Sequence, residues 1–131
     1  MSIFKNVFGS SNSSEHKNDF NWNMLTSISQ LDEIVALSNQ EPVLIFKHST
    51  RCGISRMVLK QFENQFDRDS KATAYFLDLL NHRDISNAIS EKFNVAHQSP
   101  QLLLIKGEIC IYDVSHDAID AEKLMARLLP R

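Results

Sequence analysis

The sequence contains little glycine and little cysteine. Its three glycines, Gly9, Gly53 and Gly107, are too far apart in 131 residues to build a GxGxxG dinucleotide fingerprint or a GxxxxGK phosphate loop. The two cysteines, Cys52 and Cys110, are too few for a disulfide framework, and such sparse use is typical of a reducing compartment. These shortages exclude nucleotide cradles of both kinds and favour a cytoplasmic protein.

The chain also lacks an excess of charge and any long apolar run. Its 14 Lys and Arg against 16 Asp and Glu leave a net charge of −2, too balanced for a dedicated nucleic-acid binder. No window approaches the roughly 18 consecutive apolar residues of a membrane-spanning helix, and the start has no apolar run of signal-peptide length. We therefore expect no nucleic-acid or membrane partner. The 43% of hydrophobic residues is enough to close the core of one domain.

The first 21 residues differ in composition from the rest. They are rich in Ser and Asn, so we expect a disordered or loosely ordered tail over residues 1–21 and a folded domain over residues 22–131, beginning at Trp22. Ser27 and Gln30 have the spacing of a capping box, which predicts a helix over about 28–39. The unbroken apolar run at residues 43–46 predicts a strand covered on both faces.

Alternating strand and helix patterns follow. Apolar residues at helical spacing predict helices over 53–67 and after Asp84, with a strand at 72–77 between them. Two further strands, at 101–105 and 109–114, are separated only by a turn at Gly107, and a last helix is expected near 117–129. Crossover helices impose parallel pairing and the short turn imposes antiparallel pairing. We predict an α/β fold with a mixed four-stranded sheet flanked by helices and an extra N-terminal helix.

Cys52 is the most informative residue, because it follows a buried strand and begins an amphipathic helix. Free amide groups and the positive end of the helix dipole favour a thiolate there. The flanking residues Lys47, His48, Arg51 and Arg56 add positive charge. Since the thiolate is the nucleophile in thiol–disulfide exchange, the sequence predicts a reactive cysteine.

Two nearby features bear on the chemistry of Cys52. Ser55 stands three residues later, where a dithiol redox motif holds its second cysteine; its hydroxyl can donate a hydrogen bond to a thiolate but cannot attack a mixed disulfide. Ser99 and Pro100 precede the strand at 101–105, and we expect a cis bond between them. A cis bond places the backbone of Ser99 beside the Cys52 loop, where it can pair with a bound peptide.

At these residues the chain resembles thioredoxin-fold proteins, and more narrowly the monothiol bacilliredoxins of the YtxJ type. The resemblance rests on KHSTRCGISRMVL at 47–59 and VAHQSPQLLLIKGE at 95–108, and it covers roughly residues 22–130. It implies that Cys52 is the redox residue, that Ser55 and Pro100 match the family's serine and cis-proline, and that the low-molecular-weight thiol is bacillithiol. Gly53 stands where members often carry proline.

The resemblance also implies an activity. It predicts a monothiol thiol–disulfide oxidoreductase that removes bacillithiol from S-bacillithiolated client proteins, with bacillithiol as co-substrate and no tightly bound cofactor. The basic residues Lys47, Arg51 and Arg56 suit the malate carboxylates of bacillithiol, because charged donors bind carboxylates well. Ser99 and Pro100 are expected to contact the client.

Two alternatives remain open from the sequence. The run from Cys52 to Ser55 is also similar to the CGFS signature of monothiol glutaredoxins, which hold a [2Fe-2S] cluster, and thiolates suit that ligation. Those proteins carry a Gly-Gly pair past the cis-proline strand, where this chain has only Gly107. The other alternative is a non-catalytic thioredoxin-fold binding module that engages partners through the Ser99–Pro100 edge.

The remaining cysteine and histidines give weaker signals. Cys110 lies in a predicted strand, where a buried free thiol is the ordinary outcome. His97 is either a base or charge partner for the nucleophile or an exposed loop histidine, and His116 is placed at the start of the last helix. No zinc site is expected, because His48, Cys52, His97 and His116 have no recognised ligand spacing.

Overall fold

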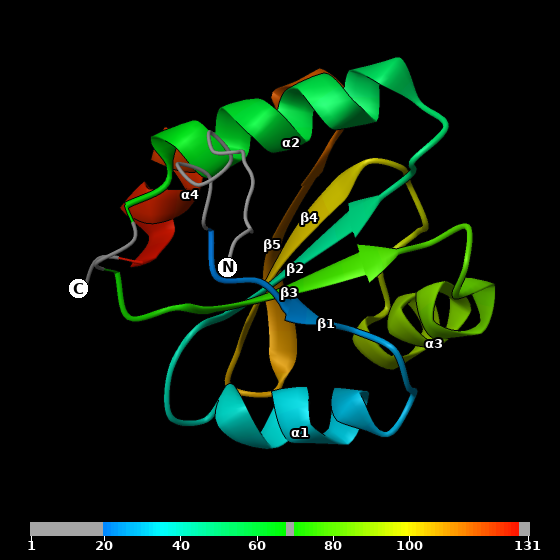
Figure 1. Cartoon of the computed structure of the whole chain (residues 1–131). Helices are drawn as coiled ribbons and strands as arrows, with labels where there is room; N and C mark the ends of the chain where they lie inside the picture. Colours follow the sequence, from blue (N-terminus) through cyan, green and yellow to red (C-terminus); the bar gives the residue numbers. More distant parts are fainter. Residues whose placement is uncertain (1–19, 68–69, 129–131) are drawn as a thin grey trace, which may run out of the picture.

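The structure of the chain, a computed structural model, describes residues 20–67 and 70–128. In these residues one mixed sheet has the strand order β1-β3-β2-β4-β5. Figure 1 shows the sheet between two helical layers, with α2 and α4 on one face and α1 and α3 on the other. The elements are β1 (Asn23–Met24), α1 (Gln30–Leu37), β2 (Val43–His48), α2 (Gly53–Gln65), β3 (Thr73–Asp78), α3 (Arg83–Phe93), β4 (Gln101–Lys106), β5 (Ile109–Ser115), a 3-10 turn (His116–Ala118) and α4 (Ala121–Leu128).

The pairing follows the predicted pattern, with one more strand than expected. β2 and β3 are parallel, whereas β4 is antiparallel to both β2 and β5. The four-strand expectation is wrong because Asn23 and Met24 pair in parallel with β3 as a fifth, edge strand. Both side chains of this two-residue strand are exposed, so no hydrophobic alternation marks it. The fold class is nevertheless the predicted one.

The central position of β2 explains its apolar run. Val43 and Ile45 enter the core beneath α1 and α3, whereas Leu44 and Phe46 enter the core beneath α2 and α4. All four side chains are completely buried. A strand covered by helices on both faces has no polar side to present, which is why polar alternation is absent. None of the helices in the described part of the chain has the length and apolar character needed to cross a bilayer.

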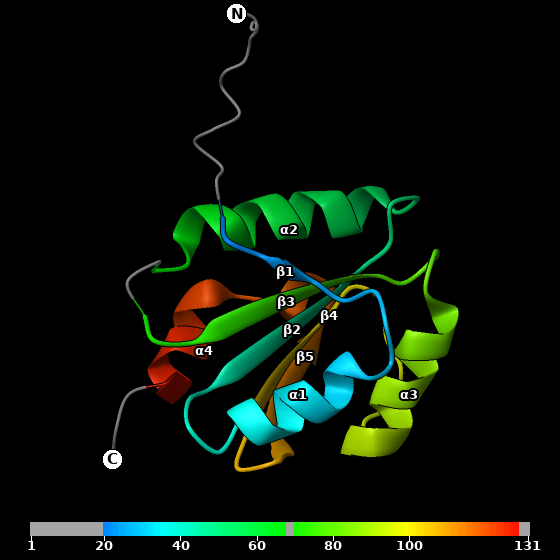
Figure 2. The same ribbon diagram turned by 60° about the horizontal axis from the view of Figure 1, so that its bottom comes forward.

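Phe20, two residues before the predicted domain start, packs against core residues. Phe20, which the sequence placed in the tail, stacks on Trp22 with ring centroids 4.4 Å apart and also contacts Phe66 at 5.7 Å. The indole Nε1 of Trp22 donates a 2.6 Å hydrogen bond to Glu63 of α2. In Figure 2 the described N-terminal segment, drawn in blue, runs from beside α2 into β1 at the edge of the sheet. The expected tail over residues 1–19 lies outside the described residues.

Two predicted helix boundaries differ from the structure. The first helix begins at Gln30 rather than 28, because only half of the capping box forms: the Gln30 side chain accepts the Ser27 N–H at 2.9 Å, but the Ser27 hydroxyl pairs with Ser29. The last helix is split. His116 adopts a left-handed φ of 56° in a 3-10 turn, and α4 starts only after Asp120.

Candidate active site

Cys52 lies where β2 runs into α2. β2 extends two residues beyond the predicted strand, through Lys47 and His48, before the loop begins. The Cys52 N–H donates to the carbonyl of Ser49 at 3.2 Å, and the Cys52 carbonyl accepts the first helical hydrogen bond from Arg56 at 3.2 Å. Cys52 is therefore the N-cap residue of α2, with a free and partly exposed thiol. This position confirms the predicted placement of the thiol at a helix N-terminus, where amide groups favour an anion.

The register of the sheet places the Ser99–Pro100 segment at the same end (Figure 1). The bond between Ser99 and Pro100 is cis. Gln101 pairs with Lys47 of β2, so the two residues before it lie beside the end of β2 that leads to Cys52. The Pro100 carbonyl accepts a 3.0 Å hydrogen bond from the backbone of His116. Two segments nearly fifty residues apart in sequence thus form one end of the molecule.

The Ser55 hydroxyl contacts Ser49 and His48, and not the Cys52 sulfur as the sequence suggested. The side chain is completely buried, and its oxygen accepts the N–H of Ser49 at 3.1 Å and lies 2.8 Å from Nδ1 of His48. Because no other acceptor for the hydroxyl is found among the described residues, the hydroxyl donates to His48 Nδ1. The expected donation to the Cys52 sulfur is therefore wrong. Ser55 instead ties the first turn of α2 to the end of β2.

His48 is a buried neutral partner rather than one of the cations around the thiol. Its side chain is only 5% exposed, and its ring lies 5.4 Å from that of Phe76. Burial lowers the pKa of His48, the Asp78 carboxylate opposes this shift, and Arg56 reinforces it. A neutral imidazole has one acceptor nitrogen, which fits the hydrogen bond from Ser55. The sequence listed His48 among the positive charges because it placed the residue in the loop.

Lys47 also departs from its predicted place. It points to the opposite face of β2 from His48 and is completely buried. Its Nζ lies 2.8 Å from Nδ1 of His97, and burial lowers the pKa of Lys47 to about 8. The expectation that Lys47 belongs to an exposed cationic flank is wrong, because β2 continues through it and neighbouring strand residues point to opposite faces.

The exposed charges beside Cys52 are those of Arg51 and Arg56. Arg56 folds back over the first turn of α2, and its Nη1 donates to the carbonyl of Thr50 at 3.0 Å. Ile54 and Met57 lie on the same exposed face of the helix, with 53% and 57% of their surface accessible. Both are among the apolar residues whose helical spacing predicted this helix, but they do not enter the core. The surface around the thiol is thus both cationic and apolar.

The loop before Pro100 is held by residues whose roles the sequence did not indicate. Gln101 is buried, and its side chain donates to the Ala96 carbonyl at 3.1 Å and accepts the Gln98 N–H at 3.3 Å. The Ser86 hydroxyl of α3 lies 3.2 Å from Nδ1 of His97. Only the position of Gln101 next to Pro100 could have suggested its role. His97 is an exposed loop histidine whose Nδ1 lies 2.8 Å from the buried ammonium of Lys47.

Cys110 lies at the other end of the sheet. It pairs with Ile105, which pairs with Val43 at the start of β2, whereas Cys52 follows the end of β2. The six-residue strand alone spans about 17 Å, and a disulfide requires Cα atoms roughly 4.4–6.8 Å apart. Cys110 therefore cannot reach Cys52 within one folded chain. It is half-buried rather than fully buried, and its Sγ donates to the Tyr112 carbonyl at 3.3 Å.

We expect thiol reagents to distinguish the two cysteines. Burial raises the pKa of Cys110, so its reactive thiolate is scarce at pH 7. In the native protein, iodoacetamide should modify Cys52 at least about tenfold faster than Cys110, as followed by intact mass and peptide mapping over time. The Cys110→Ser variant should retain only the fast phase. Equal rates at the two sites would contradict this prediction.

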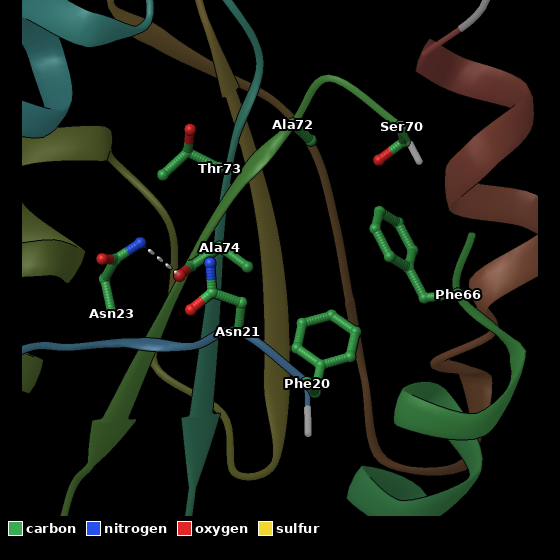
Figure 3. A pocket seen from close by; sticks show the side chains of 8 residues that line it. All are labelled: Phe20, Asn21, Asn23, Phe66, Ser70, Ala72, Thr73 and Ala74. Carbon is green, nitrogen blue, oxygen red and sulfur yellow. Dashed lines mark hydrogen bonds between the residues drawn. The ribbon is translucent and has the colours of Figure 1, made fainter. Parts of the chain in front are cut away.

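Two cavities in the described residues lie away from the thiol. A pocket of about 290 Å³ opens beside β1, where Phe20 and Phe66 form one side and Asn23 donates to the carbonyl of Ala74 (Figure 3). A larger cavity of about 720 Å³ lies near Pro42, where β2 begins. Among the described residues, no group of three or more His, Cys, Asp or Glu side chains converges to hold a metal ion.

Comparisons with known proteins agree with this geometry. The model of the family "Monothiol bacilliredoxin BrxC" matches residues 23–124. A solved structure assigned as an oxidoreductase with a thioredoxin fold is 30% identical, with a TM-score of 0.69 over 79% of this chain and 89% of that chain. Thioredoxins from Malassezia sympodialis (Mala s 13; 21% identity, TM-score 0.61, 82% and 88% covered) and Arabidopsis thaliana (O2; 20%, 0.57, 82% and 91%) share the fold. Because the family match spans most of the chain and includes Cys52, the chain belongs to the monothiol bacilliredoxin BrxC family and has a thiol redox role.

Proposed function

We propose that the protein reduces bacillithiol mixed disulfides on cytoplasmic client proteins through Cys52. The observation that carries the proposal is the lone thiol at the N-terminus of α2, with a buried hydroxyl at Ser55 and Cys110 at the far end of the sheet. The Cys52 thiolate attacks the bacillithiol sulfur, and the client thiolate leaves. The product is a disulfide between Cys52 and bacillithiol. A second, external thiol then releases bacillithiol from Cys52.

The surface around Cys52 has groups that suit both the bacillithiol part and the protein part of a mixed disulfide. Arg51 and Arg56 are exposed cations close to Cys52 in the sequence, and they suit the malate carboxylates of bacillithiol. Ile54 and Met57 add exposed apolar area beside the thiol, which suits a protein client. The Ser99 backbone lies at the same end for pairing with an extended client segment. Bacillithiol acts as a co-substrate and no tightly bound cofactor takes part.

The two alternatives from the sequence gain less support. The family match favours bacilliredoxin chemistry over the cluster-binding chemistry of CGFS glutaredoxins. A pure binding module gives no reason for an accessible thiol at a helix N-terminus flanked by Arg51 and Arg56. Both alternatives are outcomes of the experiment below.

Turnover should depend on one sulfur only. With a bacillithiolated client and an external thiol, Cys52→Ser should reduce client release to the uncatalysed rate, because a hydroxyl is not a nucleophile for disulfides at neutral pH. Cys110→Ser should turn over at the wild-type rate. Release of client thiol is measured together with the intact mass of the enzyme, which should show one bacillithiol adduct on Cys52. Client binding without turnover in the wild type would instead indicate a binding module, and a coloured, dimeric wild type would indicate a cluster protein.

A further inference from the structure

The buried amine of Lys47 determines which nitrogen of His97 carries a proton. The Lys47 ammonium has only donors, and its Nζ lies 2.8 Å from His97 Nδ1. The Ser86 hydroxyl reaches the same nitrogen at 3.2 Å. Nδ1 is therefore an acceptor, so the ring proton of a neutral His97 is on Nε2. That N–H has no partner among the described residues, and the side chain is exposed.

Lys47 is a buried cation with no carboxylate beside it. Among the described residues, no acidic side chain forms an ion pair with Lys47, and the shift in its pKa is attributed to burial alone. An uncompensated buried charge lowers stability, so such groups are found mainly where they serve a site. Because Lys47 has a pKa of about 8, it remains an ammonium at pH 7 and polarises the imidazole in front of it. The exposed edge of His97 is therefore an electropositive donor.

This donor lies at the reactive end of the sheet. His97 stands three residues before Pro100, in the loop that Gln101 anchors through Ala96 and Gln98. Since Gln101 pairs with Lys47, the loop flanks the end of β2 that leads to Cys52. Arg51 and Arg56 belong to the other segment of the site, the β2–α2 loop and the first turn of α2. The site thus has cationic or electropositive groups on both of its segments.

We propose that His97, held by Lys47, is a specificity-determining residue whose Nε2–H binds a carboxylate of the low-molecular-weight thiol carried on Cys52. This inference rests on the proposed function and assigns a further contact to the same site. Burial lowers the pKa of His97, and the charges that face its ring, Lys47 from β2 and Arg83 from α3, lower it further. His97 consequently stays a neutral donor at neutral pH instead of switching charge.

The substitution His97→Asn keeps an acceptor for Lys47 and removes the Nε2–H donor. The asparagine oxygen takes the place of Nδ1 and still accepts from Lys47, but nothing replaces the Nε2–H. We measure kcat/KM for bacillithiol disulfide, which carries carboxylates, and for hydroxyethyl disulfide, which does not. The ratio of the two values should fall about tenfold, the range of a hydrogen bond to a charged group. The same change at His116, an exposed histidine whose backbone contacts Pro100, should leave the ratio unchanged.

The variant Lys47→Met adds a readout that a purely structural role would not produce. Removing the ammonium removes one of the charges that lower the pKa of His97, so the pH dependence of the substrate ratio should shift to higher pH than in the wild type. Taking the ratio cancels the ionisation of Cys52, which is common to both substrates. If His97→Asn fails to fold, the pH profile of Lys47→Met still tests the role of His97.

The outcomes distinguish this inference from the proposed function. An unchanged ratio in His97→Asn, or a Lys47→Met profile identical to the wild type, overturns the role of His97 and leaves the activity of Cys52 intact. If the wild type fails to react with bacillithiol disulfide while it reduces hydroxyethyl disulfide, the proposed function is overturned, and the carboxylate contact with it.

Discussion

Replacing Ser55 by cysteine is expected to turn a lasting bacillithiol adduct on Cys52 into an internal disulfide. The new sulfur would lie one helical turn from Cys52, at the position of the Ser55 oxygen, 2.8 Å from His48 Nδ1. Burial keeps the His48 ring neutral by lowering its pKa, so the ring accepts a hydrogen bond from the introduced thiol. The new sulfur attacks the Cys52 sulfur, its proton passes to the departing bacillithiol, and mass spectrometry should show loss of the adduct and of two hydrogens.

The wild type and Ser55→Ala are the matched controls. Both lack a sulfur at position 55, so both should keep the adduct until an external thiol is added. Ser55→Ala should also be less stable by about 1–2 kcal/mol, because His48 and the Ser49 N–H lose a buried partner. Persistence of the adduct in Ser55→Cys would show that the position is out of reach of Cys52. A wild-type adduct that cleared unaided by joining Cys52 to Cys110 would contradict the placement of these residues at opposite ends of the sheet.

The substitution Lys47→Met should raise the free energy of unfolding by about 2–3 kcal/mol at pH 7. Burial lowers the pKa of Lys47 from 10.5 to about 8, and each pKa unit corresponds to about 1.4 kcal/mol. The lost hydrogen bond to His97 offsets about 1 kcal/mol of this gain. Methionine has a similar unbranched shape and needs no solvation. A stabilised variant whose substrate ratio has a changed pH profile would mean that the lysine is retained for function.

The difference in unfolding free energy between Lys47→Met and the wild type should depend on pH. Below pH 8, Lys47 is charged in both the folded and the unfolded chain, so the full penalty is present. Between pH 8 and 10.5 the folded protein has released the proton and the unfolded chain has not, so wild-type stability rises relative to the variant. The difference between the two proteins, measured by urea unfolding, should shrink across this window. Lys92→Met, at an exposed ion pair with Asp32, should change stability by less than about 0.5 kcal/mol. A Lys47→Met protein less stable than wild type at pH 7 would contradict the prediction.

The sequence predicted the elements whose signals are local. The apolar run in β2 indicated a central strand, and helical spacing after Cys52 indicated that the thiol starts a helix. β1 was missed because its stability comes from pairing with β3, and two exposed residues carry no pattern. The packing of Phe20 was missed because its partner Phe66 is distant in sequence.

The side-chain contacts of the site were not predictable in the same way. Lys47 and His48 were assigned to a loop because charged and polar residues ordinarily end a buried strand. Their burial depends on a partner fifty residues away for Lys47, and on Ser55 of the following helix for His48. Such pairings depend on which face of the sheet each residue points to, and hydrophobicity patterns do not report the distance between two polar groups. The sequence identified the nucleophile, whereas the groups that hold its surroundings required the fold.

The placement of Trp22 makes the protein its own spectroscopic probe. It is the single tryptophan of the chain, so all indole emission comes from the seam between the N-terminal segment and α2. Its ring is stacked on Phe20 and bonded to Glu63 on the same helix that begins at Cys52. Hydration of the indole on loss of this packing shifts its emission to longer wavelength. Unlabelled protein therefore reports by fluorescence on the integrity of the helix that carries the thiol, during unfolding and during reaction with bacillithiol disulfide alike.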